Sequence, residues 1–284
     1  MSLHKSIFEI IKTRKSVRSY LDKEIEEDEL KKIMRDINKF QGPFRDEVRF
    51  ELIIDDKVSL NEAKLGTYGI IQGAKYYLAV IATRDKECLF ELGYATERAI
   101  LYLTDRNLGT CWMGGTFERA NFANKVELKE GEYLPVVVPF GYIKDKQSIK
   151  DKMIRMSAGS DKRTDWGGVF FNEEFGKPLH PNDAGLYKSA LEAVRVAPSA
   201  SNKQPWRVIK KGNDYEFYLN PTPGYGDKLG FNIQEVDIGI AMCHFEMVAI
   251  EDDLKGQWDI SLGNKEKNKD DMIYVAKWRT PAAN

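Results

Sequence analysis

The sequence predicts an α+β protein in which a central β-sheet is flanked by helices, built as two fused, pseudo-symmetric halves. Amphipathic helical segments alternate with short apolar segments along the 284 residues, which favours a sheet covered by helices. A motif also repeats: residues 91–95 read Glu-Leu-Gly-Tyr-Ala, residues 237–241 read Asp-Ile-Gly-Ile-Ala, and Trp112 and Trp258 follow at the same offset. The length suits one large domain or two fused ones, and the repeat favours fusion.

Each half contains an early amphipathic helix. In residues 26–38, apolar residues recur at helical spacing and acidic residues fill the first turn, where the helix dipole favours them. Residues 183–196 are the counterpart in the second half. The repeated motif lies in two longer helices, which we expect to end near Gly109 and Gly256, because glycine is favoured just after a helix C-terminus.

The strands are predicted from short segments rich in β-branched and aromatic residues. The connection between the halves falls in a stretch rich in Gly, Asp and Lys, residues 157–181, so we place the halves at 1–165 and 166–284. The predicted strands are residues 48–54, 76–82 and 134–140 in the first half, and 206–210 and 215–219 in the second, the last two joined by a Gly-Asn turn.

The composition is that of a soluble globular protein, with 42% hydrophobic and 31% charged residues. A net charge of −1 gives no sign of a nucleic-acid or acidic-membrane partner. The longest apolar run, around residues 133–142, holds about ten residues and two prolines, which is far too short to span a membrane. Three cysteines without a C-x-x-C pair, and no signal peptide, lead us to expect a cytoplasmic protein.

The most specific stretch of the chain is residues 198–207, Pro-Ser-Ala-Ser-Asn-Lys-Gln-Pro-Trp-Arg. The two prolines bias Ala197 and Gln204 away from helical conformation. The small and amide side chains between them suit close contact and hydrogen bonding with a flat polar ligand. Because the stretch follows a helix and precedes a strand, it is predicted to be a ligand-binding loop.

This loop resembles the signature loop of the flavin-dependent nitroreductase family. Residues 14–20, Arg-Lys-Ser-Val-Arg-Ser-Tyr, resemble that family's N-terminal flavin motif, R-x-S-x-[KR], at the end of the first helix. Residues 108–115, Leu-Gly-Thr-Cys-Trp-Met-Gly-Gly, resemble its turn facing the flavin ring. The resemblance covers most of the chain and implies a nitroreductase-like fold.

One departure from the family pattern implies a duplicated, single-chain member. In ordinary members the Pro-Ser loop follows the first motif after about one helix and a turn, but here residues 41–45, Gln-Gly-Pro-Phe-Arg, hold that place. In the family, two identical subunits build each site, one giving the Arg-Ser motif and the other the Pro-Ser loop. This chain holds one contributor in each half, so we expect one flavin per chain. A monomer is compatible with this arrangement, since the internal interface replaces the usual subunit contact.

The resemblance implies flavin mononucleotide (FMN) as cofactor and assigns residues to it. Arg14 and Ser16, with Lys15 between them, are candidates for the phosphate, and Lys162 and Arg163 are further ones unless that stretch is only a solvated connector. Charge-assisted hydrogen bonds to a phosphate contribute about 1.5–3 kcal/mol each.

The flavin ring gives a second set of candidates. Arg18 is a candidate for the N1–C2 edge, where one charge pair at about 4 Å is worth on the order of 4 kcal/mol before desolvation; the alternative is a surface arginine next to Tyr20. Glycine lets the backbone approach the ring closely, with an N–H facing N5. Gly114 and Gly115 are the candidates for this contact with the ring; the alternative is that these two glycines form a plain loop. The resemblance also implies that the ring edge and ribityl chain are covered by Pro198, Ser199, Ala200 and Asn202. Gln204 and Trp206 fit either the site or structural packing.

The resemblance implies an FMN-dependent oxidoreductase that moves hydride from NADH or NADPH, through flavin N5, to a nitroaromatic, a quinone or a similar small acceptor. No acid–base residue is assigned, because the cofactor carries the chemistry and the protein supplies orientation and electrostatics. The three histidines show no metal-binding spacing, and no G-x-S-x-G or G-x-G-x-x-G motif supports a hydrolase or a Rossmann site. The alternatives are a flavin carrier or sensor without robust turnover, and an interaction scaffold.

Overall fold

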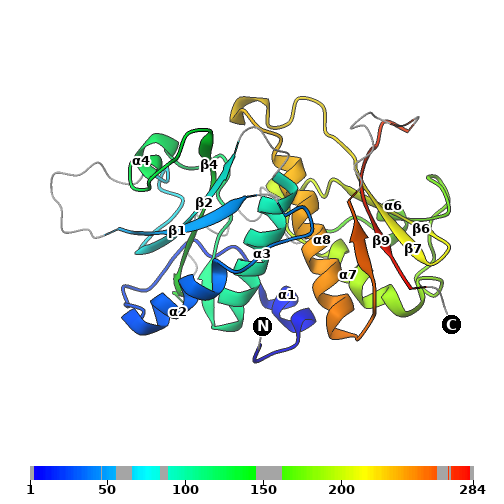
Figure 1. Ribbon diagram of the computed structural model, residues 1–284, viewed down its shortest axis with the longest axis horizontal. Coiled ribbons are helices and arrows are strands. Elements are labelled where there is room, and N and C mark those ends of the chain that lie inside the picture. The colour runs from blue at the N-terminus through cyan, green and yellow to red at the C-terminus, as the bar shows by residue number, and fades with distance from the viewer. Residues whose placement is uncertain are drawn as a thin grey trace.

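The computed structural model describes residues 3–45, 47–55, 66–83, 89–144, 162–260, 268 and 270–281. Two β-sheets lie at opposite ends of the molecule, with a layer of helices between them (Figure 1). None of the helices in these ranges is long and apolar enough to cross a membrane. The described helices are α1 (Ile7–Thr13), α2 (Glu27–Ile37), α3 (Leu89–Asp105), α4 (Arg119–Ala123), α6 (Trp166–Val169), α7 (Lys188–Arg195) and α8 (Ile233–Glu251).

The two sheets have the same topology. The first is ordered β1-β2-β4-β3 and the second β5-β6-β7-β9-β8, and all neighbours are antiparallel except β5 and β6. When the added edge strand β5 is set aside, each strand of one sheet has a counterpart in the other. The strands are β1 (Val48–Ile54), β2 (Tyr76–Thr83), β3 (Leu108–Thr110), β4 (Glu132–Tyr142), β5 (Phe170–Asn172), β6 (Trp206–Lys211), β7 (Asp214–Leu219), β8 (Gln257–Asp259) and β9 (Ile273–Arg279).

This repetition confirms the predicted α+β class with two fused, pseudo-symmetric halves. All strands of the first sheet end by residue 142 and those of the second begin at residue 170. The division between the halves at residue 165 stays a prediction, because residues 145–161 lie outside the described residues. Each of the five predicted strands is present, extended by no more than two residues at either end.

The central strand β2 shows why the first sheet is buried on both faces. Its side chains alternate between two apolar clusters, as the two-residue period of a strand requires. Leu78 and Val80 join the large core shared with the helices, whereas Ala79 and Ile81 join a second cluster that contains Phe122 of α4. All four side chains are fully buried, which explains the continuous apolar run in the sequence.

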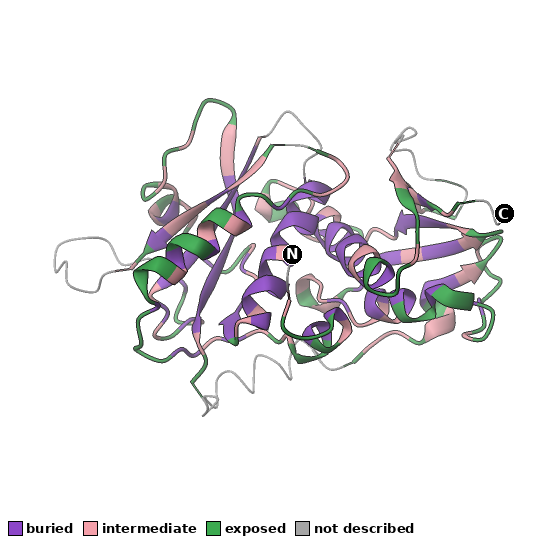
Figure 2. Cartoon of the chain, turned by 60° about the horizontal axis from the view of Figure 1, so that its bottom comes forward, coloured by how far each residue is buried: buried purple, intermediate pink, exposed green. Residues whose placement is uncertain are grey.

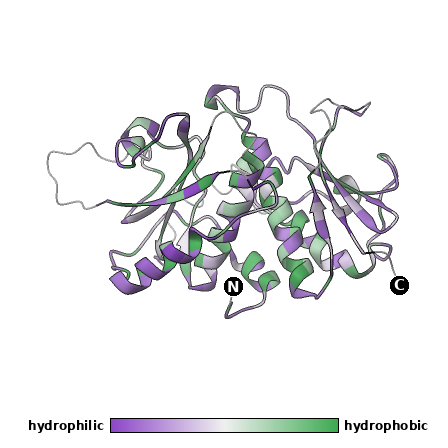
Figure 3. Ribbon diagram, viewed as in Figure 1, coloured by the Kyte–Doolittle hydropathy of each residue, from purple (hydrophilic) through white to green (hydrophobic). Residues whose placement is uncertain are grey.

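The layer between the sheets is built on the pair α3 and α8. Both helices are buried over most of their length (Figure 2), and hydrophobic residues concentrate in this layer (Figure 3). They cross where Gly93 faces Gly239: a Cβ on Gly93 would overlap the carbonyl oxygen of Val236, and a Cβ on Gly239 would overlap that of Phe90. The central glycine of the repeated motif is therefore the contact point of the two halves.

The predicted helix ends were wrong at both long helices. α3 ends at Asp105 and α8 at Glu251, before Gly109 and Gly256. The left-handed position after each helix is occupied by Asn107 (φ 60°) and Asp253 (φ 55°), residue types that tolerate this conformation. The two glycines instead allow close packing, because a Cβ on Gly109 would lie 2.9 Å from the Val17 side chain and one on Gly256 would overlap the ring of Trp278.

The helix predicted over residues 183–196 is also shorter than expected. A 3₁₀ turn, Gly185–Tyr187, precedes α7, which begins only at Lys188. Gly185 has a positive φ of 60°, a conformation outside the right-handed helix. Of the predicted apolar stripe, Ala190, Leu191 and Val194 are fully buried, whereas Leu186, which lies in the 3₁₀ turn, is 78% exposed, so the prediction was wrong at that residue.

Candidate functional site

The Arg-Ser motif lies in an extended segment between α1 and the edge of the first sheet. Ser16 forms a parallel bridge with Thr110 of β3, and the Val17 N–H donates to the Thr110 carbonyl at 2.8 Å. The Tyr20 hydroxyl donates back to the Val17 carbonyl at 2.7 Å and so fixes the segment's curvature. Residues 14–18 are thereby held along β3, whose continuation leads into the glycine turn.

The glycine turn meets the second half. Met113 exchanges two backbone hydrogen bonds with Val137 of β4, which fixes the strand before the turn. A Cβ on Gly114 would lie 2.7 Å from Cδ1 of Ile233, and a Cβ on Gly115 would lie 2.9 Å from Cδ2 of Leu229. Both contacts are with the ends of flexible side chains, so a larger residue at either position would require the side chain of Ile233 or Leu229 to shift.

The Pro-Ser loop is held in a strained conformation. Ser201, Asn202 and Gln204 all have positive φ, 46°, 54° and 50°, in the left-handed region that non-glycine residues rarely adopt. Each costs about 1–3 kcal/mol, and such strain is found at sites where the surroundings impose one geometry. Here the Ser199 hydroxyl accepts from the Gln204 N–H at 2.8 Å, and Asp237 of α8 accepts from the Ala200 N–H at 2.9 Å.

The basic pair after the connector contacts this loop. Arg163 donates to the Asn202 side-chain oxygen at 3.2 Å and to the Val196 carbonyl at 3.1 Å, while the Asn202 amide donates to the Lys162 carbonyl at 2.8 Å. Arg163 is therefore part of the loop's support, and Lys162 is exposed beside it. Gln204 is structural as well, since its amide bonds Thr164 and Asn202, and Trp206 is fully buried.

The motifs of the two halves are linked through buried side chains. The Arg14 Nε lies 3.9 Å from Glu97 of α3, and Glu97 is bonded to His244 of α8 at 3.0 Å. The other ring nitrogen of His244 lies 3.0 Å from the carbonyl oxygen of Ala193 in α7, just before the Pro-Ser loop. Arg14 is thus three contacts away from the helix that carries the loop.

The start of α8 completes this arrangement. Ile233 touches the glycine turn, and one turn later Asp237 holds the loop at Ala200. The Arg-Ser motif reaches the same region through Thr110, which precedes the turn on β3. Candidate residues from both halves therefore border one region at the junction of the two halves; their contacts with a ligand remain a prediction.

A family model described as "Putative TM nitroreductase" matches residues 6–249. The chain belongs to this nitroreductase family. The same fold is seen in a solved structure of a nitroreductase-like protein from Thermotoga maritima MSB8, which is 21% identical, with a TM-score of 0.58 and coverage of 98% of this chain and 95% of that one.

Single-unit nitroreductases match only part of the chain. An FMN-dependent nitroreductase from Clostridium difficile R20291 is 19% identical and covers 49% of this chain and 88% of its own, with a TM-score of 0.40. A nitroreductase with bound FMN from Bacteroides fragilis NCTC 9343 is 17% identical and covers 51% and 92%, with a TM-score of 0.40. No curated protein matches the chain.

Glu97 and His244 form a hydrogen-bonded pair in the buried centre of the protein. Both side chains are fully buried. Burial alone would raise the pKa of Glu97, but the hydrogen bond and charge of His244, the charge of Arg14 and the Trp112 indole hold that pKa below its usual value. The two ring nitrogens of His244 face Glu97 and the Ala193 carbonyl, each at 3.0 Å.

Sequence reasoning missed this pair. In the sequence, His244 shows no metal-binding spacing and Glu97 belongs to no recognised motif. A signal was present, because both are polar residues inside nearly continuous apolar helices, a few residues after the repeated motif. Their partnership could not be read from the sequence, since the two residues are separated by 147 positions and meet across the halves.

Arg14 fits the role of an anion ligand. Its side chain is only 10% exposed, and its Nε is buried without a hydrogen-bond partner among the described residues. A buried N–H group without an acceptor lowers the stability of the fold, so a ligand that accepts a hydrogen bond from it is favoured. With Lys15 and Ser16 adjacent, the segment offers positive charge and a hydroxyl donor of the kind that a phosphate group requires.

Asp237 supports the Pro-Ser loop as a neutral acid. Burial raises its pKa to about 8, only partly offset by the hydrogen bond from the Ala200 N–H. Its second oxygen is buried without a hydrogen-bond partner in the described part of the chain. Below pH 8 the folded protein therefore holds a proton here that the unfolded chain releases above about pH 4.

The free energy of unfolding should consequently fall as the pH rises from about 4 to 8, by up to about 1.4 kcal/mol per pH unit from this group. Asp237→Asn keeps the oxygen that accepts from Ala200 and removes the titration. We expect urea unfolding between pH 5 and 9 to give a flatter profile for the variant, which gains stability relative to wild type at the alkaline end. Parallel profiles for the two proteins would contradict this assignment.

Proposed function

We propose that this protein is an FMN-dependent oxidoreductase that passes hydride from NADH or NADPH to a nitroaromatic, a quinone or a similar electron-poor acceptor. The observation that carries the proposal is that the Arg-Ser motif of one half and the Pro-Ser loop of the other both connect to α8, the loop directly at Asp237 and Arg14 through Glu97 at His244. Membership of the nitroreductase family supports the same reading.

The proposed phosphate site is the segment after α1. Arg14 supplies a guanidinium with a buried, unbonded N–H, and Lys15 and Ser16 supply further donors. Glu97 orients Arg14 from the protein side, since its carboxylate lies 3.9 Å from the guanidinium. Arg163 and Lys162 contact Asn202 of the other half, and they add positive charge beside the loop.

Bound FMN would supply the hydride-accepting atom, and the protein would supply contacts around the ring. Gly114 and Gly115 let the backbone approach the ring face, and Arg18 holds a positive charge toward the N1–C2 edge. Pro198, Ser199 and Ala200 cover the ring edge and ribityl chain. Both ends of the Asn202 amide are bonded to Arg163 and Lys162, so we assign Asn202 the role of positioning this loop.

The absorbance spectrum of the purified protein under anaerobic conditions tests the proposal. We expect a flavin spectrum that bleaches on addition of NADH or NADPH and returns on addition of a quinone. Flavin colour that persists with both nucleotides would instead support a carrier or sensor. Colourless protein with no measurable affinity for added FMN would contradict flavin binding altogether.

Arg18 gives a more specific prediction about the bound flavin. Arg18→Ala should lower the flavin midpoint potential by about 30 mV, equivalent to about 1.4 kcal/mol for two electrons, because a positive charge near the ring favours the reduced state. Spectroelectrochemical titration measures the shift, and Lys12→Ala, an exposed change on α1, is the control. An unchanged potential in the Arg18 variant would remove this residue from the ring edge.

A further inference from the structure

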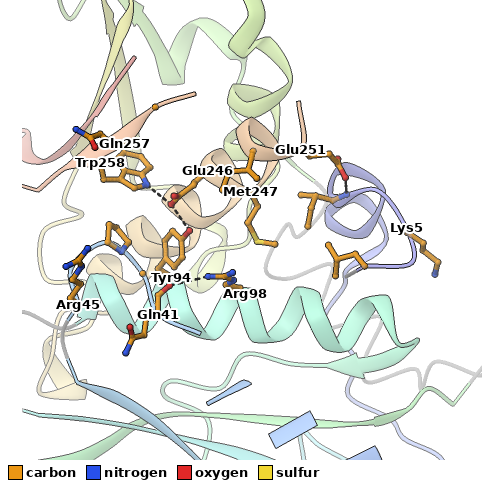
Figure 4. Close-up of a pocket in the computed structure, with 16 residues that line it drawn as sticks. Lys5, Gln41, Arg45, Tyr94, Arg98, Glu246, Met247, Glu251, Gln257 and Trp258 are labelled. Carbon is orange, nitrogen blue, oxygen red and sulfur yellow. Dashed lines mark hydrogen bonds between the residues drawn. The ribbon is translucent and has the colours of Figure 1, made fainter. Parts of the chain in front are cut away.

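A cavity lies between α3 and α8, at the end of α8 away from the Pro-Ser loop. Its volume is about 690 Å³, within the range of small-molecule sites. Tyr94 and Arg98 of α3 line one wall and Glu246 and Met247 of α8 the other (Figure 4). Residues 41–45 and 256–258 close the end of the cavity near Trp258.

This cavity occupies the pseudo-symmetric counterpart of the candidate flavin site. Residues 41–45 follow α2 and precede β1, as the Pro-Ser loop follows α7 and precedes β6. Glu91, in the repeated motif, accepts from the N–H groups of Gly42, Phe44 and Arg45, as Asp237 accepts from that of Ala200. The internal symmetry of the chain therefore gives a second site, equivalent to the candidate flavin site but lined by different side chains.

The charges of the two positions differ in one respect. At the first, His244 is paired with Glu97. At the second, the repeat places Arg98 where the first has His244, and Cys243 where the first has Glu97. A basic residue is therefore kept, while the acid is replaced by a thiol. Burial raises the pKa of the Cys243 thiol well above its usual value, so Cys243 stays neutral.

Arg98 is left without an acidic partner among the described residues. Its Nε is buried with no hydrogen-bond partner there, and its Nη1 reaches only the Gln41 carbonyl, at 3.4 Å. The two acids of the cavity are already engaged: Glu246 accepts from the Tyr94 hydroxyl at 2.6 Å and the Trp258 indole at 2.8 Å, and Glu251 accepts from the Ile7 N–H at 2.7 Å. Arg98 also lies over the Phe40 ring, 5.0 Å from its centroid, so its guanidinium faces the cavity without an ion pair among the described residues.

We propose that this cavity binds a small aromatic carboxylate, with the carboxylate on Arg98 and the ring between Trp258, Pro43 and Met247. A guanidinium binds a carboxylate through two parallel hydrogen bonds, which would satisfy the buried Nε. The cavity lining carries three cations, Lys5, Arg45 and Arg98, and two acids, Glu246 and Glu251. This balance suits an anion of single charge better than a phosphate, and the second half has no Arg-x-Ser motif. A second FMN is thus not the expected occupant.

Isothermal titration of the flavin-loaded protein with salicylate, and with neutral salicylamide for comparison, tests this site. We expect one salicylate per chain, at least tenfold weaker binding of salicylamide, and no release of FMN. Arg98→Gln should weaken salicylate binding by roughly tenfold to a hundredfold, the loss of a charge-assisted pair. Arg35→Gln, an exposed arginine on α2, is the matched control and should bind salicylate as wild type does.

A second variant guards against a folding defect in Arg98→Gln. Arg98→Lys keeps the positive charge at the cavity wall but not the fork of N–H groups, so it should bind salicylate more weakly than wild type and more tightly than Arg98→Gln. Equal binding by wild type and either variant, displacement of FMN by salicylate, or a second FMN that is lost in Arg98→Gln would each overturn the proposal. The FMN spectrum is read separately from the salicylate heat, so failure here is distinguishable from failure of the proposed function.

Discussion

Gly239→Val is expected to lower the free energy of unfolding by about 3–5 kcal/mol, near the upper end for single substitutions. A Cβ at residue 239 would lie 2.8 Å from the Tyr94 backbone nitrogen and would overlap the Phe90 carbonyl oxygen. Both obstacles are backbone atoms of a buried helix, so no side-chain rotation can relieve the overlap. The helices have to separate, and each apolar contact between them is weakened.

Urea unfolding of the variant measures this effect. Ser189→Val, at an exposed position of α7, controls for placing valine in a helix; because valine has a higher helix propensity than glycine, propensity alone would not destabilise the Gly239 variant. Because the helix crossing also sets the distance between the two halves, the Gly239 variant should bind FMN more weakly than the control does. A loss of stability no larger than that of the control would mean that the α3–α8 crossing is looser than described.

Arg14→Ala is expected to weaken FMN binding by roughly tenfold to a hundredfold or more, because it removes at least one charge-assisted hydrogen bond to the phosphate. Riboflavin, which lacks the phosphate, should lose much less affinity in the same variant. Arg14→Lys should fall between wild type and alanine, since it keeps the charge but not the fork of N–H groups. Quenching of flavin fluorescence gives the dissociation constants of all three proteins.

A structural explanation for weaker binding has to be separated from a direct one. Arg14 also neutralises the buried Glu97, and its loss leaves that carboxylate with His244 and Trp112 only. Unfolding of each variant should therefore be measured alongside binding. Equal loss of FMN and riboflavin affinity in Arg14→Ala would show that the residue acts on the fold and not on the phosphate.

Much of the architecture could be predicted because it depends on local pattern. The strands follow from β-branched and aromatic runs, and the repeat predicted two halves from a handful of letters. Gly93 and Gly239 explain why both copies of the motif contain glycine at the same place: only glycine allows the two helices to cross so closely. The helix ends were mispredicted because asparagine and aspartate can take the left-handed conformation assigned to glycine.

The centre of the candidate site could not be predicted, because it depends on how the halves dock. Glu97, His244 and Arg14 come from three helices or their ends, and nothing in their local sequence indicates that they meet. The cavity beside Arg98 could not be predicted for the same reason. Its recognition depends on the structural equivalence of the two halves, in which Cys243 takes the place of Glu97. Duplication preserved the frame of both positions while their side chains diverged.

A crystal structure determined with saturating FMN tests the central claim most directly. We predict one flavin per chain, with its phosphate at residues 14–16 and its ring edge against residues 198–202 of the other half. Flavin bound in the cavity lined by Arg98 and Trp258, two flavins per chain, or a flavin that touches one half alone would contradict the account.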